Sequence, residues 1–436
     1  MTSSPLSTVI IAQKRGTALG ITSICSANPF VLETSFAHAR ANEIPLLIES
    51  TCNQVNQFGG YTGQTPEQFM TALKQLAEKH GFPKERLQVG GDHLGPNPWR
   101  DEAAERAMEK SRTLVEAYVV AGYTKLHIDT SMKCADDGER PLSTEIIARR
   151  AADLAQIAEA SYQKMGNPGP APHYVIGTEV PAPGGVDDEE EGPPAVTSTQ
   201  SVEETITTTR DAFRKLGLEA AWERVIAVVV QPGVEYGNES LFDYDAAEAG
   251  PLSEFIKGVT GLVFEAHSTD YQTKTALREM VRDQFAILKV GPALTFAFRE
   301  AVFALADIEE IWRAGSWVSH IREVIDDVMI ANPKYWRSYY PGNEQQQAYA
   351  RQFSLSDRIR YYWPAPEIET ALQLLLNNLA ANPIPLPLLS QFLPEQFRAV
   401  RDGNLRNESR ALIQHKISAV LDDYAFACGF PTRFDS

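Results

Sequence analysis

The sequence predicts a (β/α)8 barrel that carries a helical extension at its C-terminal end. Over about the first 300 residues, strand-like segments alternate with helical patterns, as is typical of parallel α/β folds. Several of these strands are near-continuous apolar runs, such as IPLLIES and RVIAVVV, which are expected where helices cover both faces of a sheet. The alternative is a doubly wound open sheet, but eight regular units without a G-x-G-x-x-G loop favour the barrel.

The predicted strands follow one another at regular intervals along this part of the chain. They span residues 18–26, 44–51, 87–91, 123–130, 174–180, 224–231, 261–267 and 285–290. Capping signals mark helices between them, at Asn28-Pro29, Thr65-Pro66-Glu67-Gln68, Ser143 and Ser201-x-x-Glu204.

The pattern changes after about Ala331. An aromatic and basic segment, PKYWRSYYPGNEQQQAYARQFSLSDRIRYYWP, is followed by strongly helical sequence. We therefore divide the chain into a barrel of residues 1–330 and a helical extension of residues 331–436 that packs on it.

Composition and charge exclude several classes of protein. The chain has 436 residues and a net charge of −17, so nucleic acid and anionic membranes are poor partners. No apolar run is long enough for a membrane span, and the first residues lack the pattern of a signal peptide. The four cysteines include no C-x-x-C pair and are expected to be reduced thiols. We therefore expect a cytoplasmic protein.

Polar residues stand at the carboxyl ends of these apolar strands, where barrel enzymes carry their active sites. His93 and His267 follow strands on opposite sides of the barrel, and Glu179 follows a strand between them. Two imidazoles and a carboxylate suit a divalent metal, Zn²⁺ first, with Mg²⁺ or Mn²⁺ as alternatives. The simpler interpretation is that each histidine only hydrogen-bonds a loop. We interpret His127 as a buried, hydrogen-bonded histidine.

Two carboxylates, Asp92 and Asp129, are the candidates for acid–base catalysis. Beside a cation, a carboxylate stays ionised and takes a proton from a bound hydroxyl. The alternative for each is a buried aspartate that fixes loop amides.

Further polar residues are candidates for substrate contacts: Asn28, Asn53, Gln57, Gln231, Lys289, Arg358 and Arg360. Lys289 ends a buried strand and would form either a core ion pair or a contact to a phosphate or carbonyl. The two arginines belong to the strongest cationic segment of the chain. Arginine binds phosphate bidentately, but these side chains would equally tie the extension to the acidic barrel.

One long loop, residues 182–196 with the sequence APGGVDDEEEGPPAV, is strongly acidic. Such a run is commonly a solvated loop. Because it follows a strand end, a mobile lid over the active site is the functional alternative.

Seven long motifs resemble the GatZ/KbaZ family, the Z subunits of tagatose-1,6-bisphosphate aldolase. They are NQVNQFGGYTG (53–63), GGDHLGPNPW (90–99), GTEVPAPGG (177–185), VVQPGVEYG (229–237), FEAHSTDYQ (264–272), LKVGPALTFA (288–297) and SLSDRIRYYW (354–363). The resemblance covers nearly the whole chain and implies a (β/α)8 barrel related to class II aldolases.

The class II aldolase pattern also implies roles for single residues. Asp92 matches the catalytic base, His93 and His267 match metal histidines, and Glu179 matches a metal-site glutamate. Gln231 stands where those aldolases have a third metal histidine, and its oxygen is a weaker zinc ligand. The loop after His267 departs from the glycine-rich phosphate loop, which makes a bisphosphate a poorer fit.

The resemblance implies two alternative functions. The first is a metal-dependent enzyme that converts D-tagatose 6-phosphate to D-fructose 6-phosphate by retro-aldol cleavage and re-addition at carbon 4. The second is a non-catalytic subunit that stabilises a Y-type class II aldolase partner. The set of acid and metal candidates favours the enzyme, and we expect a homo-oligomer. A kinase is disfavoured because the chain has no G-x-x-x-x-G-K-[ST] loop.

Overall fold

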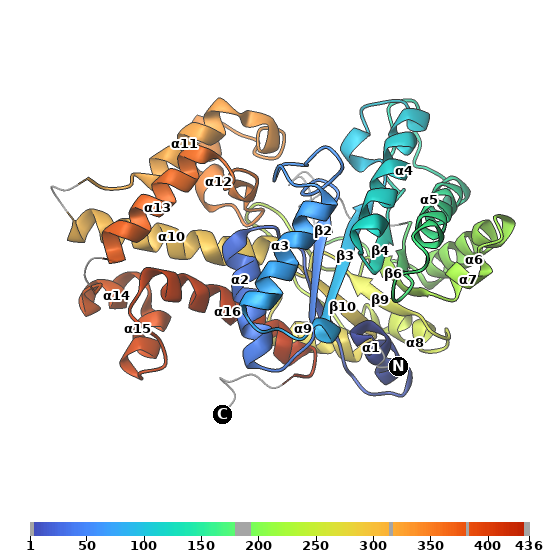
Figure 1. Cartoon of the computed structure of the whole chain (residues 1–436), viewed down its shortest axis with the longest axis horizontal. Helices are drawn as coiled ribbons and strands as arrows, with labels where there is room; N and C mark the ends of the chain where they lie inside the picture. Colours follow the sequence, from blue (N-terminus) through green and yellow to red (C-terminus); the bar gives the residue numbers. More distant parts are fainter. Residues whose placement is uncertain (1–3, 179–192, 314–316, 381–382, 431–436) are drawn as a thin grey trace.

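The computed structural model describes residues 4–178, 193–313, 317–380 and 383–430. Eight parallel strands close into a barrel in the order β1-β10-β9-β6-β5-β4-β3-β2, and helices surround it (Figure 1). The barrel strands are β1 (Ile21–Ile24), β2 (Leu46–Thr51), β3 (Leu87–Leu94), β4 (Lys125–Ile128), β5 (His173–Ile176), β6 (Val225–Val230), β9 (Val263–Ala266) and β10 (Phe285–Val290). The predicted (β/α)8 barrel is confirmed.

Every predicted strand range overlaps one strand of this barrel, and two strands, β5 and β3, extend beyond their predicted range. β5 starts at His173, and the predicted range reaches residue 180, which lies outside the described residues. β3 continues to Leu94 instead of ending at Gly91. The pair Asp92 and His93 therefore belongs to the strand and not to the loop after it.

The helices around the barrel begin close to the predicted caps. They are α2 (Pro29–Ala41), α3 (Pro66–Lys79), α4 (Ala104–Ala121), α5 (Thr144–Lys164), α6 (Thr199–Lys215), α7 (Glu219–Trp222), α8 (Gly250–Lys257), α9 (Lys274–Arg282) and α10 (Pro292–Trp312). Asn28 caps α2, and Thr65 forms a complete capping box with Gln68 at α3. The predicted cap of α6 was three residues late, because Ser198 accepts the backbone N–H of Ser201 at 3.1 Å.

A helix before the first strand, α1 (Pro5–Lys14), closes the amino-terminal end of the barrel. Its buried Leu6, Val9 and Ile10 form one apolar cluster with inward-facing strand residues such as Leu47 and Val175. Burial of each such large apolar side chain contributes about 1.5–3 kcal/mol. Because this end is sealed with apolar groups, the polar interior of the barrel lies at the opposite, carboxyl end of the strands.

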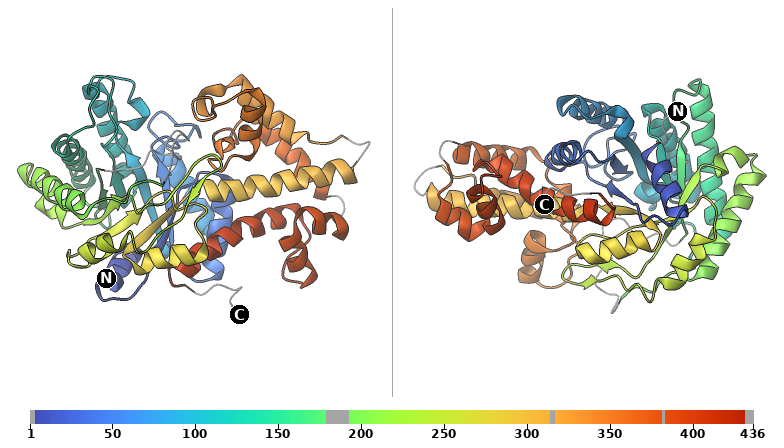
Figure 2. Two further views of the ribbon diagram at one scale, coloured as in Figure 1. Left: turned by 180° about the vertical axis from the view of Figure 1, so that it is seen from behind. Right: turned by 90° about the horizontal axis from the view of Figure 1, so that it is seen from below.

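The extension lies on one side of the barrel (Figure 1). It contains α12 (Glu344–Phe353), α13 (Pro366–Ala380), α14 (Leu386–Phe392) and α15 (Pro394–Arg401). The helix α11 (Ile321–Ala331), which ends at residue 331, packs against α12 and α13, and α10 runs from the barrel into this part of the molecule. The last helix, α16 (Ser409–Ala427), returns and packs against α2, α9, α10 and β1 (Figure 2). The N–H of Gly20 donates to the carbonyl of Cys428 at 3.0 Å. The helical wall of the barrel thus includes a helix from the segment 331–436.

A short hairpin between β6 and α8 holds the extension at the barrel mouth. Its strands are β7 (Glu235–Tyr236) and β8 (Leu241–Phe242). The carbonyl of Asn238 accepts the N–H of Leu355 at 2.9 Å, and its side-chain oxygen accepts the hydroxyls of Ser354 and Ser356 at 2.8 and 2.9 Å. These bonds fix the segment that carries Arg358 and Arg360.

The main apolar core runs from the barrel wall into the extension without a break. One cluster contains buried side chains from α2 through α16, among them Phe36, Leu114, Phe264, Leu305 and Leu412. The two parts therefore share one packed interior. Among the helices described, none is long and apolar enough to cross a membrane.

Candidate active site

The strand β3 directs two neighbouring side chains into the barrel mouth. Its pairing with β4 shifts register between Gly91 and Leu94, and His93 has a φ of 49°. A bulge of this kind redirects side chains that would otherwise alternate between the two faces of the strand. As a result Asp92 and His93 both line the mouth cavity, although they are only 1% and 3% exposed.

Two glycines of this segment leave room for neighbouring groups. A Cβ at Gly90 would lie 2.9 Å from Cγ of Glu49, a buried carboxylate inside the barrel. A Cβ at Gly95 would lie 1.7 Å from the carbonyl oxygen of Asp129. Any side chain at either position would therefore displace a group that supports the site.

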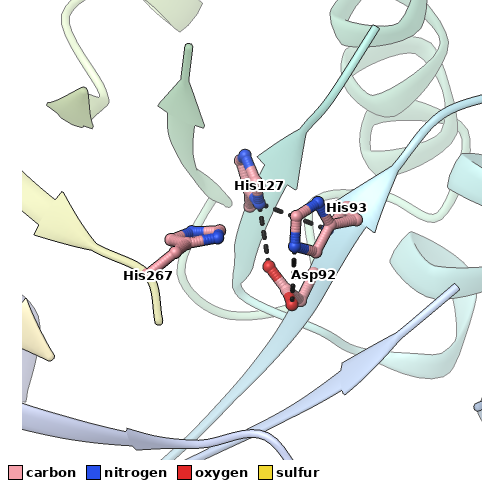
Figure 3. Close-up of side chains that lie close together, drawn as sticks. All are labelled: Asp92, His93, His127 and His267. Carbon is pink, nitrogen blue, oxygen red and sulfur yellow. Dashed lines mark hydrogen bonds and ion pairs between the residues drawn. The ribbon is translucent and has the colours of Figure 1, made fainter. Parts of the chain in front are cut away.

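Three histidines from three strands meet beside Asp92 (Figure 3). His93 lies on β3, His127 on β4, and His267 directly follows β9. The ring centroids are 5.0 Å apart for His93 and His127, 5.0 Å for His93 and His267, and 5.1 Å for His127 and His267. One ligand atom of each histidine and one oxygen of Asp92 lie within 4.8 Å of one another. The structure thus brings His93 and His267 together and adds His127 to them.

Each of these imidazoles is held by a carboxylate through one ring nitrogen. The pairs are His93 Nδ1 with Asp129 Oδ2 at 2.8 Å, His127 Nδ1 with Asp92 Oδ1 at 2.8 Å, and His267 Nε2 with Glu265 Oε1 at 3.1 Å. A neutral imidazole that donates to a carboxylate keeps a lone pair on its other nitrogen. In His127 that nitrogen, Nε2, is buried and has no hydrogen-bond partner among the described residues.

A buried layer of charged groups lies inside the barrel, below the histidines. Lys125 and Glu265 belong to it, each two residues before a histidine of the cluster, together with Glu49 and Lys289. The Nζ of Lys125 lies 2.6 Å from a carboxylate oxygen of Glu49 and 2.6 Å from one of Glu265. The Nζ of Lys289 lies 2.6 Å from Oδ1 of Asp92 and 3.2 Å from Oε2 of Glu49. These ammonium groups offset the three carboxylates, because a buried charge without a partner costs several kcal/mol.

This surrounding charge sets the ionisation of the groups at the mouth. Burial alone would raise the pKa of Asp92, but the charges of His93 and Lys289 hold that pKa well below its usual value. Burial lowers the pKa of His93, whereas Asp92 and Asp129 raise it, and the net pKa is above its usual value. Burial lowers the pKa of His267 to about 3, against the bond from Glu265. His267 is therefore neutral at pH 7, the form that binds a metal.

A cavity of about 90 Å³ opens directly above these groups. Besides Asp92, His93, His267 and Lys289, its lining includes Asn53, Tyr61, Tyr236, Asp270, Arg360 and Tyr361. A larger cavity of about 890 Å³ lies between the barrel and the extension, and it shares Gln54, Tyr61, Gly291 and Arg360 with the first. The two cavities therefore adjoin, with Arg360 at their boundary.

Only some of the predicted substrate contacts lie at this mouth. Asn53 and Lys289 line the smaller cavity. Asn28 lines the larger cavity, and its Oδ1 caps α2 by accepting the N–H of Phe30 at 2.9 Å.

Two further candidates are engaged elsewhere and line neither of these two cavities. Gln57 donates to the carbonyl of Lys110 on α4 at 3.0 Å. The side-chain oxygen of Gln231, at the position of the expected third metal ligand, accepts the N–H of Gly233 at 2.8 Å.

Of the two candidate arginines in the extension, one lines the cavities and the other is engaged elsewhere. Arg358 is 2% exposed, stacks over the ring of Tyr339 and donates to the carbonyl of Tyr335 at 2.9 Å. Arg360 lines both cavities and donates to the hydroxyl of Tyr361 at 3.0 Å. Of the pair, only Arg360 lines these cavities.

The remaining candidates are Asp129, Glu179 and the acidic loop. Asp129 is fully buried behind His93, where it also accepts the hydroxyl of Ser131 at 2.6 Å. Glu179 lies outside the described residues, as does the loop 182–196 up to residue 192.

The sequence interpretation of His127 as a buried, hydrogen-bonded histidine is confirmed, but its place in the histidine cluster and the role of Lys125 were not predicted. Both residues stand on β4 at alternate positions, so both face the barrel interior, and Asp129 follows directly after the end of the strand. This alternation is a usable signal, because a lysine and a histidine on the inner face of a short strand require partners there.

The donor set fits a divalent transition metal. Three imidazoles that leave further positions open are typical of catalytic zinc sites. Metal-bound histidines commonly donate their other N–H to a carboxylate, as the partners Asp129, Asp92 and Glu265 allow here. Mg²⁺ prefers oxygen ligands, and the cluster offers mainly nitrogen. This buried cluster can therefore bind a metal.

Comparison with known proteins gives a consistent family match. Residues 6–429 match the model for D-tagatose-1,6-bisphosphate aldolase subunit GatZ/KbaZ-like proteins. A crystal structure of a probable tagatose 6 phosphate kinase from Sinorhizobium meliloti 1021 is 45% identical and has a TM-score of 0.85, with 94% of this chain and 100% of that chain covered.

More distant structures share much less. The YdjI aldolase from Escherichia coli K12 is 10% identical with a TM-score of 0.41, over 85% of this chain and 95% of that chain. The fructuronate-tagaturonate epimerase UxaE from Cohnella laeviribosi is 12% identical with a TM-score of 0.48, over 95% of this chain and 82% of that chain. At these values neither similarity bears on the reaction.

Proposed function

Because this chain belongs to the GatZ/KbaZ-like family of D-tagatose-1,6-bisphosphate aldolase subunits, we propose that it is a metal-dependent ketohexose 6-phosphate 4-epimerase. Its substrate pair would be D-tagatose 6-phosphate and D-fructose 6-phosphate. The observation that carries this proposal is the Asp92 carboxylate beside three carboxylate-backed imidazoles at the barrel mouth. A scaffold protein has no need for such a buried and costly arrangement.

The metal site in this proposal consists of His93, His127 and His267. It keeps His93 and His267 of the set expected from the sequence and adds His127, while Glu179, the third member of that set, lies outside the described residues. A bound divalent ion would polarise the substrate ketone and stabilise the negative charge that carbon–carbon cleavage leaves on the three-carbon fragment. Asp129 and Glu265 act as positioning residues, since each holds one of these rings through a hydrogen bond.

Asp92 is the proposed acid–base group. Its carboxylate takes the proton of the carbon-4 hydroxyl while the bond between carbons 3 and 4 breaks, and the electron pair of that bond passes to carbon 3. The low pKa of Asp92 does not prevent this transfer. As the bond breaks, the carbon-4 hydroxyl becomes a carbonyl, and a protonated carbonyl is a far stronger acid than the carboxyl group of Asp92. The aldehyde then presents its other face, the bond re-forms, and Asp92 returns the proton to the new hydroxyl.

Two cationic side chains, Lys289 and Arg360, have separate roles in this proposal. Lys289 lines the cavity and keeps Asp92 ionised through its 2.6 Å contact. Arg360 binds the phosphate from the rim of the cavity, whereas Arg358 holds the extension together.

The test is conversion of D-tagatose 6-phosphate by the purified protein. Fructose 6-phosphate would be followed in a coupled assay after loading with Zn²⁺, Mn²⁺ or Mg²⁺, and after treatment with a chelator. We expect turnover that depends on the metal and is highest with Zn²⁺. Asp92→Asn should retain metal and fold but lose about 10²–10⁴-fold in rate, the usual contribution of a general base.

The second candidate is the non-catalytic partner of a Y-type class II aldolase. The family description as an aldolase subunit favours it, and so do exposed apolar side chains near the end of α10, Trp312 at 47% and Trp317 at 90%. Absence of turnover on any ketohexose phosphate, together with stabilisation of such an aldolase in a mixture, would favour this candidate. The kinase described for the 45% identical protein has no support here, since the sequence lacks a G-x-x-x-x-G-K-[ST] loop.

A further inference from the structure

The carboxylate of Asp270 occupies the amino-terminal end of α10 at the barrel mouth. Its Oδ1 accepts the N–H of Gly291 at 3.0 Å and the N–H of Ala293 at 2.8 Å. These amides begin a helix of 21 residues, and the first amides of a helix form a natural position for an anion. The chain therefore fills this anion position with a group of its own.

The loop after β9 holds Asp270 firmly in this place. The residues on either side of it include Ser268 and Tyr271, whose φ values of 53° and 64° are unusual for residues other than glycine. Thr269 donates to the carbonyl of Lys289 at 2.6 Å, and the hydroxyl of Tyr424 donates to the carbonyl of Thr269 at 2.8 Å. Strained backbone of this kind persists only where surrounding contacts hold it, and it is typical of functional sites.

Asp270 is also part of the site itself. It lines the same cavity as Asp92, His267, Lys289 and Arg360, and it is 3% exposed. Burial raises the pKa of its carboxyl to about 6, against the two amides and Arg360, so the group is mainly ionised above neutral pH. A ligand in this cavity therefore meets a fixed negative charge at the end of α10.

The cations of the cavity are not equally available to an anionic ligand. Lys289 already lies at 2.6 Å from Asp92 and at 3.2 Å from Glu49. The guanidinium of Arg360 donates to uncharged groups, the hydroxyl of Tyr361 at 3.0 Å and the carbonyl of Asp357 at 3.1 Å. One phosphate would be attracted to Arg360, whereas a second phosphate near α10 would face a carboxylate in place of free amides.

We infer that Asp270 restricts the substrates to ketose monophosphates by accepting an uncharged hydroxymethyl end and rejecting a phosphate there. This inference rests on the proposed function and narrows it. With the single phosphate at Arg360, the terminal hydroxyl at the opposite end of the sugar lies toward Asp270. The carboxylate of Asp270 accepts a hydrogen bond from that hydroxyl. A hexose 1,6-bisphosphate, the ligand class in the family description, would then bind poorly to this chain.

The test compares the binding of two hexitol phosphates, which lack the ketone and cannot be cleaved. D-glucitol 6-phosphate and D-glucitol 1,6-bisphosphate would be titrated calorimetrically into the zinc-loaded protein at pH 8. We expect the wild type to prefer the monophosphate by at least about tenfold in Kd. Asp270→Ser frees the two amides and should shift the ratio of the two Kd values toward the bisphosphate by about tenfold or more.

Two further variants make the result decisive. Asp270→Asn keeps the shape of the side chain and removes its charge, so it should shift the ratio in the same direction even if Asp270→Ser folds poorly. Glu369→Gln removes an exposed carboxylate that lines the larger cavity, and it should leave the ratio unchanged.

Three outcomes would overturn the inference: a wild type that prefers the bisphosphate or binds both ligands equally, a wild type that binds neither, or a ratio that neither Asp270 variant shifts. Failure of the proposed function is distinguishable, because it appears as absence of turnover of D-tagatose 6-phosphate. The binding ratio is measured without turnover.

Discussion

The Nζ of Lys289 lies 2.6 Å from Oδ1 of Asp92, so the proposed acid–base group is one half of a buried ion pair. The same ammonium group lies 3.2 Å from Glu49, which in turn contacts Lys125 at 2.6 Å. The group that would take the substrate proton is therefore coupled to the charged layer inside the barrel. The charge of His93 and this coupling to Lys289 together hold the pKa of Asp92 well below its usual value despite its burial.

Removal of Lys289 should damage both stability and rate. Lys289→Met leaves Glu49 and Glu265 with Lys125 as their remaining ammonium partner among the described residues, and it takes from Asp92 the lysine that it contacts. Loss of one partner from a buried pair typically costs about 3–5 kcal/mol in the free energy of unfolding. Urea unfolding would measure this loss. Lys110→Met, which removes a partly exposed contact to Glu102, is the control and should cost at most about 1 kcal/mol. Equal losses in the two variants would contradict the account.

His127 should be needed for metal binding, and Gln231 should not. His127→Gln removes the buried Nε2 that has no partner among the described residues, and we expect the dissociation constant for Zn²⁺ to rise by at least about tenfold. Gln231→Ala should leave it nearly unchanged, because that side chain already binds the backbone of Gly233. Competition with a chromophoric chelator would measure both constants. A larger effect of Gln231→Ala than of His127→Gln would mean that Gln231, and not His127, is the metal ligand.

Zinc affinity should fall as the pH is lowered through the pKa of His93. That pKa lies above its usual value of 6.5 because of Asp92 and Asp129, despite burial, so the metal-free protein holds a proton there that the metal must displace. His267, with a pKa of about 3, contributes no such proton above pH 5. We therefore expect a loss of about tenfold in affinity per pH unit below the pKa of His93 and release of about one proton on binding. Calorimetry at pH 6 in two buffers with different ionisation enthalpies would count that proton, and a count near zero would refute this assignment.

The two arginines should separate a binding defect from a folding defect. Arg360→Gln should raise the KM for the sugar phosphate at least about tenfold with little change in Tm, because Arg360 lines the cavity and its two acceptors, the hydroxyl of Tyr361 and the carbonyl of Asp357, are uncharged. Arg358→Gln should lower Tm instead, because it breaks the stack on Tyr339 and the bond to Tyr335. Steady-state kinetics and thermal unfolding of both variants test this difference. The reverse pattern would mean that Arg358 is the phosphate contact.

The predicted fold was recovered from the sequence because barrel strands carry strong local signals. Apolar runs such as RVIAVVV and caps such as Asn28 and Thr65 depend on neighbouring residues alone. The cap of α6 was misplaced because Ser198 and Ser201 are both serines at the correct spacing from possible helix starts. The return of α16 to the barrel depends on contacts distant in sequence, such as Gly20 with Cys428, and local patterns do not encode them.

The site was predicted in part, for a similar reason. The proximity of His93 and His267 follows from the closure of the barrel, which brings the strand ends to one mouth. The sequence predicts a structural role for His127, and its Nδ1 is indeed hydrogen-bonded. That its Nε2 is buried without a partner among the described residues follows only from the three-dimensional arrangement. The bulge at His93 and the capping of α10 by Asp270 depend on backbone geometry that the sequence does not display.

One measurement tests the central claim most directly: nuclear magnetic resonance of the zinc-loaded protein with D-tagatose 6-phosphate in D₂O. The account predicts D-fructose 6-phosphate that retains protium at carbon 4, because cleavage between carbons 3 and 4 inverts that carbon without removing its hydrogen. Deuterium at carbon 4 would contradict the retro-aldol route and the role of Asp92 in it. Absence of fructose 6-phosphate under every metal condition would contradict the epimerase itself.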